Sequence, residues 1–437
     1  MRRWRVVALA TLLSGTFIYY AAQNQDRLSE VYIFGTPIKD RERDEFGIYL
    51  PQSMSTKEGN SDIVKSSPDK EHHASSPSLD EHTSQNETPQ SPPGDIPDPP
   101  EPPPPKDIQL PPDTAQIGFQ AEFSFQKDLD LDLAVDVLRK FSNNKPHNYN
   151  PNGPKTHVYA TFMATRSPSL KDPYYLAIHS LIYRLLWSPR SRTDKYALVV
   201  FVADFVAPEQ RELLSGAGAI VRELAPLEWN PAVEGIQSRW KDLFAKLNMW
   251  KETEFSKIVF LDADAFPVAN PDAMFDLAVE RKCDESKLAP EDKLADGKSA
   301  CEPYVFAGIP HNPFSEENIE VNGGVLVFAP SLNMHQRLLQ NYLKYDKYDV
   351  KTVEQGFLNW QFNIKGAFPA TALDREWGAV FPKDEDEGKV KVVHEKIWSE
   401  ESEWMKKEWV EVWVEMSQFY MGEEFGKLRF WDGVAEG

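Results

Sequence analysis

The chain has 437 residues, a formal net charge of −20 at pH 7 and a sequence pI near 5.0. This acidity excludes proteins that hold nucleic acid or an anionic membrane surface with a broad basic patch. Part of the negative charge lies in a polar amino-terminal region and an acidic tail, so it says little about a substrate.

The amino terminus is typical of a membrane anchor. Residues 6–22 (VVALATLLSGTFIYYAA) carry no charge and follow the arginine-rich start MRRWR. This stretch is long enough to span a thin bilayer as a helix, and the arginines favour a cytoplasmic amino terminus. Tyr19 or Tyr20 stands where a cleavage site needs a small residue. We therefore expect residues 1–5 to be a cytoplasmic tail and residues 6–22 an uncleaved signal anchor, with a removed signal peptide as the alternative.

Residues 23–116 are predicted to be a disordered, Pro-rich stem. They are poor in large apolar side chains and rich in Ser, Pro, Asp, Glu and Lys, so burial cannot offset the entropy lost on ordering. The prolines of residues 92–112 stiffen the stem toward polyproline II. A PxxP docking ligand is the alternative, and it fits a cytosolic chain better. The glycosylation sequon that starts at Asn86 lies in this stem.

From residue 117 onward the composition is that of a globular domain. Residues 117–156 are expected to lead into it, with a helix over 129–141, and the catalytic domain is expected over 157–437. Apolar runs alternate with helical patterns, which indicates an α/β fold with a mostly parallel central sheet. The expected strands are 157–165, 197–203, 219–224 and 258–261, and the expected helices begin near Pro173, Pro208 and Ile236.

The pair Asp262 and Asp264 follows the apolar run 258–261 directly. Side chains of a strand alternate, so both carboxylates are predicted to point to one side, a few ångströms apart. Like charges held so close repel each other and are usually relieved by a divalent cation. Ligands of open α/β sheets bind beyond the carboxyl ends of strands. The alternative is an Asp-rich turn that caps a helix starting near Pro271.

The only two cysteines, Cys283 and Cys301, lie in a polar segment beyond these aspartates. In an oxidising compartment we expect a disulfide that closes this loop, worth about 3 kcal/mol. Two unpaired thiols are the alternative.

Upstream of the aspartates, IQSRWKDLFAKLNMW is predicted to be a helix. Arg239, Asp242 and Lys246 share one side of it at three- and four-residue spacing. A cation there could neutralise a departing diphosphate. The alternative is an ordinary surface pair between Asp242 and Lys246. The apolar stripe consists of Trp240, Leu243, Phe244, Leu247 and Trp250.

Further downstream, VNGGVLVFAPS (residues 321–331) combines an asparagine and two glycines with a buried strand. Glycines allow a ligand to approach the backbone closely, and Asn322 adds a donor and an acceptor beside them. The dipeptide Glu354-Gln355 then opens a helical run, FLNWQF.

Residues 389–398 (KVKVVHEKIW) are predicted to be a strand that ends in His394 and Lys396. A histidine ligand from a separate strand would complete a set of carboxylates and imidazole suited to manganese. A structural histidine is the alternative.

The order of these parts resembles glycosyltransferase family 8, the glycogenin-like enzymes of GT-A fold, and within it the Golgi-anchored fungal and plant members. The resemblance covers about residues 157–400. It rests on AKLNMW, FLDADAFPVANPD, NGGVLVFAPS, EQGFLNWQF and HEKIW in this order. It implies a GT-A (Rossmann-like) nucleotide-diphospho-sugar transferase domain.

The resemblance also implies a site. Manganese would be bound by Asp262, Asp264 and His394, and the donor would be a UDP-sugar. The implied catalytic residues are Lys246, Glu354 and Gln355. The implied donor contacts are Thr161, Tyr175 (or its equal neighbour Tyr174), Lys246, Asp262, Ala263, Asp264, Asn322, Gly323, Gly324 and Lys396.

Three departures from the family pattern stand out. The family usually has Asp-Gln-Gly where this chain has Glu354-Gln355-Gly356, which keeps the carboxylate on a longer arm. The family's H-x-x-G-x-x-K-P-W is shortened to HEKIW, which puts Lys396 in doubt as a diphosphate contact. The arginine that the family places before the helix lysine has only Arg239 as a nearby candidate.

The implied reaction is transfer of N-acetylglucosamine or glucose from a UDP-sugar to an acceptor hydroxyl, with retention of anomeric configuration. A carboxylate nucleophile such as Glu354 and attack from the leaving-group side both stay open. The acceptor would be a glycan, a glycoprotein or a lipid in the Golgi lumen, and a homodimer stays open. The alternatives are a non-catalytic, membrane-tethered sugar- or metal-binding protein of the same fold, and a D-x-D transferase that uses GDP-mannose.

Overall fold

The computed structural model describes residues 32–33, 36–37, 132–231, 241–311, 319–397 and 402–434. The predicted tail, the signal anchor at 6–22 and almost all of the stem lie outside these residues. Within the described part, no helix is both long and apolar enough to cross a bilayer. Two short strands in the stem region, β1 (Tyr32–Ile33) and β2 (Thr36–Pro37), pair antiparallel with each other.

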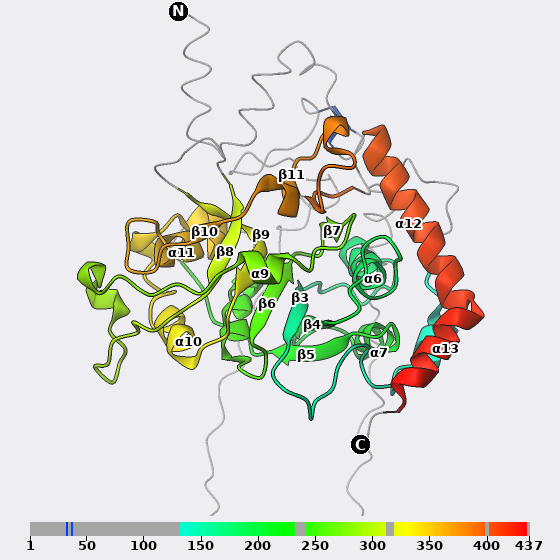
Figure 1. The fold of residues 1–437 in the computed structure, drawn as a ribbon, viewed down its shortest axis with the longest axis horizontal. Coiled ribbons are helices and arrows are strands. Elements are labelled where there is room, and N and C mark those ends of the chain that lie inside the picture. Colours follow the sequence, from blue (N-terminus) through cyan, green and yellow to red (C-terminus); the bar gives the residue numbers. More distant parts are fainter. Residues whose placement is uncertain are drawn as a thin grey trace, which may run out of the picture. The chain divides into compact units, whose positions relative to one another are not determined.

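A seven-stranded sheet forms the centre of the domain, with strand order β10-β8-β9-β6-β3-β4-β5 (Figure 1). Neighbouring strands are parallel except where β9 runs opposite to β6 and β8. The expected α/β class and mostly parallel sheet are therefore confirmed. The strands are β3 (His157–Met163), β4 (Ala197–Ala203), β5 (Ile220–Leu224), β6 (Lys257–Leu261), β8 (Phe306–Pro310), β9 (Val321–Phe328) and β10 (Thr371–Ala372).

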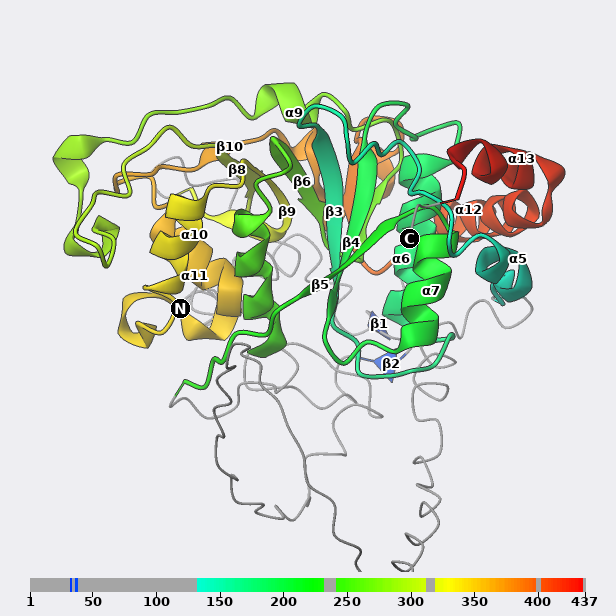
Figure 2. The ribbon, with the colours of Figure 1, turned by 90° about the horizontal axis from the view of Figure 1, so that it is seen from below.

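Helices cover both faces of this sheet, with α6 and α7 on one face and α10 and α11 on the other (Figure 2). Two helix starts were predicted correctly because each has a proline in its first turn, where no intrahelical N–H bond is lost. Asp172 also caps α6, since its side chain accepts from the Tyr175 N–H. The helices are α6 (Pro173–Leu186), α7 (Pro208–Gly216), α9 (Met274–Leu277), α10 (Leu332–Leu339) and α11 (Val353–Gln361).

The helix predicted from near Ile236 differs from expectation. Residues 232–240, including Arg239, lie outside the described part, and Asp242–Lys251 forms a 3₁₀ helix, η3. Phe244, Leu247 and Trp250 are buried as predicted. Among the described residues, three-residue 3₁₀ turns form at η4 (Glu285–Lys287), η5 (Pro290–Asp292), η6 (Tyr345–Lys347), η7 (Val350–Thr352), η8 (Arg375–Trp377) and η9 (Asp384–Asp386).

A second, three-stranded sheet of order β11-β12-β7 was not foreseen. Its strands are β7 (Ala265–Pro267), β11 (Ala379–Val380) and β12 (Val392–His394). Strand β12 pairs antiparallel with β7, and His394 stands opposite Ala265 in that register. Since β7 begins directly after the two aspartates, this small sheet brings His394 to them.

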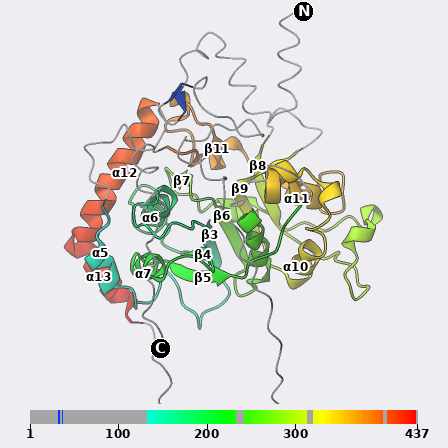
Figure 3. The ribbon, with the colours of Figure 1, turned by 180° about the vertical axis from the view of Figure 1, so that it is seen from behind.

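The carboxyl-terminal helices pack beside α6 on one side of the domain (Figure 3). Arg184 of α6 is 1% exposed and donates to Glu408 Oε1 at 2.5 Å and to the Pro267 carbonyl at 3.1 Å. This pair therefore ties α12 to the end of β7. The leading helix is shorter than the predicted 129–141. The elements are α5 (Val135–Lys140), α12 (Glu403–Met421) and α13 (Glu423–Asp432).

The expected disulfide between Cys283 and Cys301 is present, with Cα atoms 5.5 Å apart. The loop that it closes also contains Asp292, whose buried carboxylate accepts from Arg337 at 2.8 Å. The disulfide and this ion pair together hold the polar loop on the domain.

Candidate metal and donor site

The two aspartates lie on a turn at the carboxyl end of β6. Asp262 follows the last strand residue, and its N–H donates to the Gly324 carbonyl of β9 at 2.8 Å. The Ala265 N–H donates back to the Asp262 carbonyl at 2.9 Å, which closes the turn before β7. The carboxylates are close, as expected, but the turn brings them together rather than strand alternation. The helix-cap alternative is not seen, because Ala273 is the N-cap of α9, the helix that follows.

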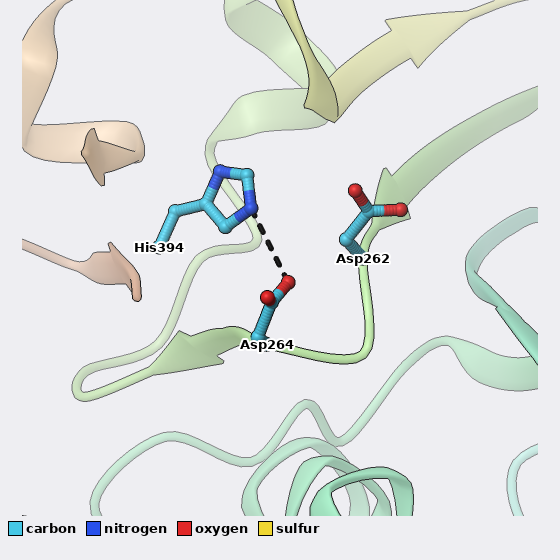
Figure 4. Close-up of side chains that lie close together, drawn as sticks. All are labelled: Asp262, Asp264 and His394. Atoms are coloured by element: carbon cyan, nitrogen blue, oxygen red, sulfur yellow. Dashed lines mark ion pairs between the residues drawn. The ribbon is translucent and has the colours of Figure 1, made fainter. Parts of the chain in front are cut away.

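Asp262 and Asp264, on the turn after β6, converge with His394 at the end of β12 (Figure 4). One ligand atom from each lies within 4.8 Å of the others. His394 Nε2 is 3.3 Å from Asp264 Oδ1, and Lys396 Nζ is 3.4 Å from Asp264 Oδ2. The predicted three-residue cluster is thus assembled, with Lys396 beside it. Two carboxylates and one imidazole are ligands that suit a divalent cation such as Mn²⁺.

The electrostatics of the cluster follow from this crowding. Burial alone would raise the pKa of Asp264, but Lys396 and His394 outweigh it and hold this pKa well below its usual range. Burial opposes the charged form of His394, but the Asp264 carboxylate raises its pKa above the usual value. Asp264 is therefore ionised and ready to serve as a ligand, whereas the raised pKa of His394 makes its deprotonation, which ligation requires, harder than for a free imidazole.

Gly324 makes the approach of these side chains possible. A Cβ atom at this position would lie 2.2 Å from His394 Cε1 and 2.8 Å from Asp262 Oδ2. Neither distance leaves room for a methyl group. The cluster therefore requires a glycine at position 324. The space that the missing side chain leaves beside the ligand atoms is the feature that fits a bound cation.

Lys246 lies on the opposite side of Asp262. It is 5% exposed, and its Nζ is 2.9 Å from both Asp262 Oδ1 and Glu354 Oε1. Burial disfavours its charge, but these two carboxylates raise its pKa above the usual value. The surface pair with Asp242 is therefore wrong, since Asp242 binds Arg166 instead, at 2.8 and 2.7 Å.

The remaining motif residues lie where β9 and α11 contact each other. Gln355 Oε1 accepts from the Gly323 N–H at 2.9 Å, and Asn322 Oδ1 accepts from the Gly324 N–H at 2.8 Å. Glu354 is 6% exposed and holds Lys246. The candidate catalytic pair of α11 thus contacts both the lysine and the glycine strand.

Three residues that the family resemblance predicts as donor contacts have little exposed surface. Ala263 is 8% exposed, and Thr161 of β3 is fully buried with a hydroxyl that has no partner in the described residues. Tyr175 is fully buried as well, and its hydroxyl donates to the Gln210 carbonyl at 3.3 Å. Its neighbour Tyr174 is only half-buried. Packing therefore favours Tyr174 over Tyr175 as a residue that a ligand could reach.

Arg166 was missed by sequence reasoning. It follows β3, and its guanidinium stacks 3.8 Å from the ring centroid of Phe205, which follows β4. Its side chain is 62% exposed, and its guanidinium group forms an ion pair with Asp242 at the start of η3. A cation is thus fixed near the carboxyl ends of β3 and β4. The sequence feature that could have identified Arg166 is its position directly after a buried strand.

Comparison with known proteins gives a consistent set of relatives. An uncharacterized protein of Schizosaccharomyces pombe is 27% identical over 293 residues, which is 59% of this chain and 79% of that protein. Galactinol synthase 1 of Solanum lycopersicum is 29% identical over 211 residues, 47% of this chain and 60% of the relative. Galactinol synthase 4 of Arabidopsis thaliana is 30% identical over 146 residues, 33% of this chain and 40% of the relative. No protein-family model matches the chain.

Among solved structures, mouse xyloside xylosyltransferase 1 aligns with 55% of this chain and 98% of its own, at 14% identity and a TM-score of 0.34. The glycosyltransferase GlyE of Streptococcus pneumoniae TIGR4 aligns with 63% of this chain and 64% of its own, at 15% identity and a TM-score of 0.37.

Proposed function

From the premise that this chain is a glycosyltransferase similar to family 8, we propose that it transfers a hexose or an N-acetylhexosamine from a UDP-sugar to an acceptor hydroxyl with retention. N-acetylglucosamine and glucose are the proposed sugars, and Mn²⁺ is the proposed cofactor. The observation that carries the proposal is the convergence of Asp262, Asp264 and His394 within 4.8 Å beside Lys246.

The cluster fits a cation that contacts a diphosphate. When bound, Mn²⁺ would offset negative charge on the phosphate oxygens as the glycosidic bond breaks. Asp262 and Asp264 would supply charged oxygen ligands and His394 a neutral nitrogen. The side chain of Asp262 is 31% exposed, against 15% for Asp264 and 14% for His394. A ligand would therefore approach from the Asp262 side.

Besides Lys396 next to Asp264, Lys246 supplies a buried positive charge to the site. Its ammonium is held at 2.9 Å from Asp262, so it lies at the edge of the same cluster. A buried, preoriented cation stabilises charge that develops on a leaving group without having to reorganise. Glu354 fixes the position of this ammonium from the other side, also at 2.9 Å. We propose that Glu354 acts through Lys246 as a positioning residue.

The compartment is a further part of the proposal. We propose that residues 23 onward lie in the Golgi lumen behind the anchor expected at 6–22. The disulfide between Cys283 and Cys301 supports an oxidising environment. Protease protection in sealed microsomes tests this topology, and digestion of the domain without detergent would contradict it.

The donor is tested by calorimetry with the full chain. UDP and GDP are titrated with and without Mn²⁺, and we expect UDP to bind only weakly unless Mn²⁺ is present. Product formation is then assayed with UDP-N-acetylglucosamine, UDP-glucose and UDP-galactose. The galactose donor is included because the plant relatives are named for making galactinol. Equal binding of GDP, or no effect of Mn²⁺, would argue against the proposed donor.

A further inference from the structure

Phe381 combines an exposed aromatic ring with a strained backbone. The residue is 47% exposed, whereas Pro382, which follows it, is buried. Its φ of +48° lies in the left-handed region, which bulky side chains rarely adopt. Such a conformation persists only where the surrounding structure fixes it, and it is most frequent at ligand sites. Among the described residues, the other bulky one with a positive φ is Val353, which directly precedes Glu354 of the candidate site.

Two contacts place the strand before Phe381 at the metal cluster. Strand β11 pairs in parallel with β12, and Val380 stands opposite His394. Because neighbouring strands lie about 5 Å apart, the Cα atom of Phe381 is roughly 6 Å from that of His394. Before β11, Gly378 packs so closely on the central sheet that a Cβ atom there would lie 3.2 Å from Val325 Cγ2. Phe381 thus stands next to a proposed metal ligand.

The turn that carries Phe381 is held by a buttress of charged side chains. Arg375 donates to the carbonyls of Val380 and Phe381, at 2.9 and 3.4 Å. The same guanidinium donates to Asp386 Oδ2 at 2.9 Å, and this oxygen also accepts from the Lys383 N–H at 2.9 Å. The backbone is therefore fixed in its strained form while the ring stays exposed. A rigid, solvent-facing ring can bind a ligand without first having to be ordered.

The charges near this ring favour an uncharged ligand. The candidate site contributes Lys246 and Lys396, which would repel a cationic acceptor. The chain that follows Phe381 contributes the exposed carboxylates of Asp384 and Glu385, which would repel an anionic one. A neutral ligand with an apolar face meets neither penalty.

We propose that Phe381 is a platform on which a neutral sugar ring of the acceptor stacks. The inference rests on the proposed sugar transfer, because it names the class of substrate that receives the sugar. A pyranose presents C–H groups on one face, which pack against an aromatic ring, while its hydroxyl groups stay in water. The acceptor is therefore a neutral glycan, held beside the donor. The contribution of Phe381 falls on the affinity for this acceptor and not on the affinity for the donor.

Saturation-transfer NMR on the full chain, with UDP and Mn²⁺ present, tests the platform. The neutral probes are lactose, maltose, chitobiose and mannobiose. An anionic sugar, 3′-sialyllactose, and vesicles of phosphatidylcholine represent the other classes of acceptor. We expect at least one neutral disaccharide to bind. Failure of all four, or preferential binding of sialyllactose or of the vesicles, would overturn the proposal.

Substitutions at Phe381 locate the binding. Phe381→Ala should weaken the bound disaccharide about tenfold, and Phe381→Trp, which keeps an aromatic face, should retain it. Phe430→Ala is the matched control, since this ring is 78% exposed but lies on α13, and it should bind as the native chain does. Undiminished binding in Phe381→Ala, or an equal loss in the control, would reject the platform.

Phe381→Gly separates a ligand-binding role from a structural one. Glycine adopts a positive φ without strain, so this variant should unfold at a urea concentration no lower than the native chain does. It should nevertheless bind the disaccharide as poorly as Phe381→Ala. A clear drop in the urea midpoint would show that the ring is needed by the fold, and it would contradict the platform.

Manganese-dependent UDP binding is measured in the same variants and should be unchanged. A native chain that binds UDP but no disaccharide would contradict only the platform. A chain that binds the disaccharide through Phe381 but does not bind UDP would support the platform and contradict only the proposed donor.

Discussion

The ammonium of Lys246 lies 2.9 Å from Oδ1 of Asp262, the more exposed carboxylate of the metal cluster. This contact joins the helix before β6 to the turn after it. Glu354 holds the same ammonium from α11. A single buried cation therefore balances one carboxylate of the cluster and one of the candidate catalytic residues, which makes the lysine the electrostatic centre of the site.

Lys246→Met should destabilise the fold as well as reduce turnover. It leaves the Glu354 carboxylate buried without its partner, which costs about 3 kcal/mol of unfolding free energy. The double variant Lys246→Met, Glu354→Gln should recover part of this loss, because neither charge remains. Urea denaturation of the two single variants and the double variant measures the coupling. Additive losses would show that the 2.9 Å contact contributes nothing.

Asp264→Asn should weaken manganese-dependent UDP binding by about tenfold or more, because an amide is an uncharged and poorer ligand for a hard cation. Mutual repulsion of the aspartates would predict no loss of stability. In the structure, however, Asp264 is flanked by His394 and Lys396, which lower its pKa. The variant should therefore also lose about 1 kcal/mol at pH 7. Calorimetry with Mn²⁺ and UDP measures the first effect, and Asp284→Asn is the control, at the N-cap of η4 with a side chain 39% exposed.

The pKa of Asp264 also gives this loss of stability a pH dependence. A carboxyl group whose folded pKa is depressed stabilises the fold above its unfolded value, near 3.8, and this contribution is lost as the pH falls toward the folded pKa. The difference between the native chain and Asp264→Asn should therefore shrink below about pH 4. A difference that stays constant from neutral to acidic pH would contradict the ion pairs around Asp264.

Gly324→Ala should abolish manganese-dependent UDP binding, because its methyl group would lie 2.2 Å from the His394 ring. Gly323→Ala is the matched control one residue earlier, where the nearest atom, Gln355 Cβ, would be 3.3 Å away. We expect the Gly323 variant to lose less affinity for UDP and Mn²⁺ than Gly324→Ala does. Equal affinities in the two variants would mean that His394 does not stand beside the bound ion.

His179→Leu should flatten the dependence of stability on pH. His179 is fully buried in α6, neither ring nitrogen has a partner in the described residues, and burial lowers its pKa to about 3. Between pH 6.5 and 3 the unfolded chain gains a proton that the folded chain does not, so stability falls as the pH falls. The total loss is on the order of 5 kcal/mol. Urea denaturation at pH 7 and pH 5 should capture about 2 kcal/mol of this loss, which accrues below pH 6.5. An equal decline in the variant would assign the effect to other groups.

Glu408→Gln should destabilise the domain by about 3 kcal/mol, since it leaves the guanidinium of Arg184 buried without a counter-charge. Glu411→Gln, three residues along the same helix at an exposed position, should cost less than about 0.5 kcal/mol. Thermal unfolding of both variants gives the comparison. Similar losses at the two positions would show that the buried pair does not secure α12.

Much of the central sheet could be predicted because buried parallel strands are continuous apolar runs. Strand β4 matches the run 197–203, and Pro173 and Pro208 mark where α6 and α7 begin. The antiparallel direction of β9 and the small sheet with β12 could not be predicted. Both depend on pairing between segments far apart in the chain, which local periodicity does not encode.

The candidate site was predictable in its members but not in its geometry. Asp262, Asp264 and His394 do meet, yet a turn and a strand register bring them together. The contact of Lys246 with Glu354 spans 108 residues, and helical spacing favoured Asp242 as its partner instead. Side-chain partners at such separations follow from tertiary packing, so no pattern within one segment could have revealed them.

The space beside Gly324 also bears on how related chains can be interpreted. An Asp-x-Asp pair is common and survives in many turns without a ligand, so its presence alone is a poor marker of an enzyme. A glycine is a stricter marker when a histidine ring and a carboxylate from two other segments leave no room for a side chain. A homologue that keeps both aspartates but carries a larger residue at this position must have moved its histidine. We expect such a homologue to have diverged from sugar transfer to another role.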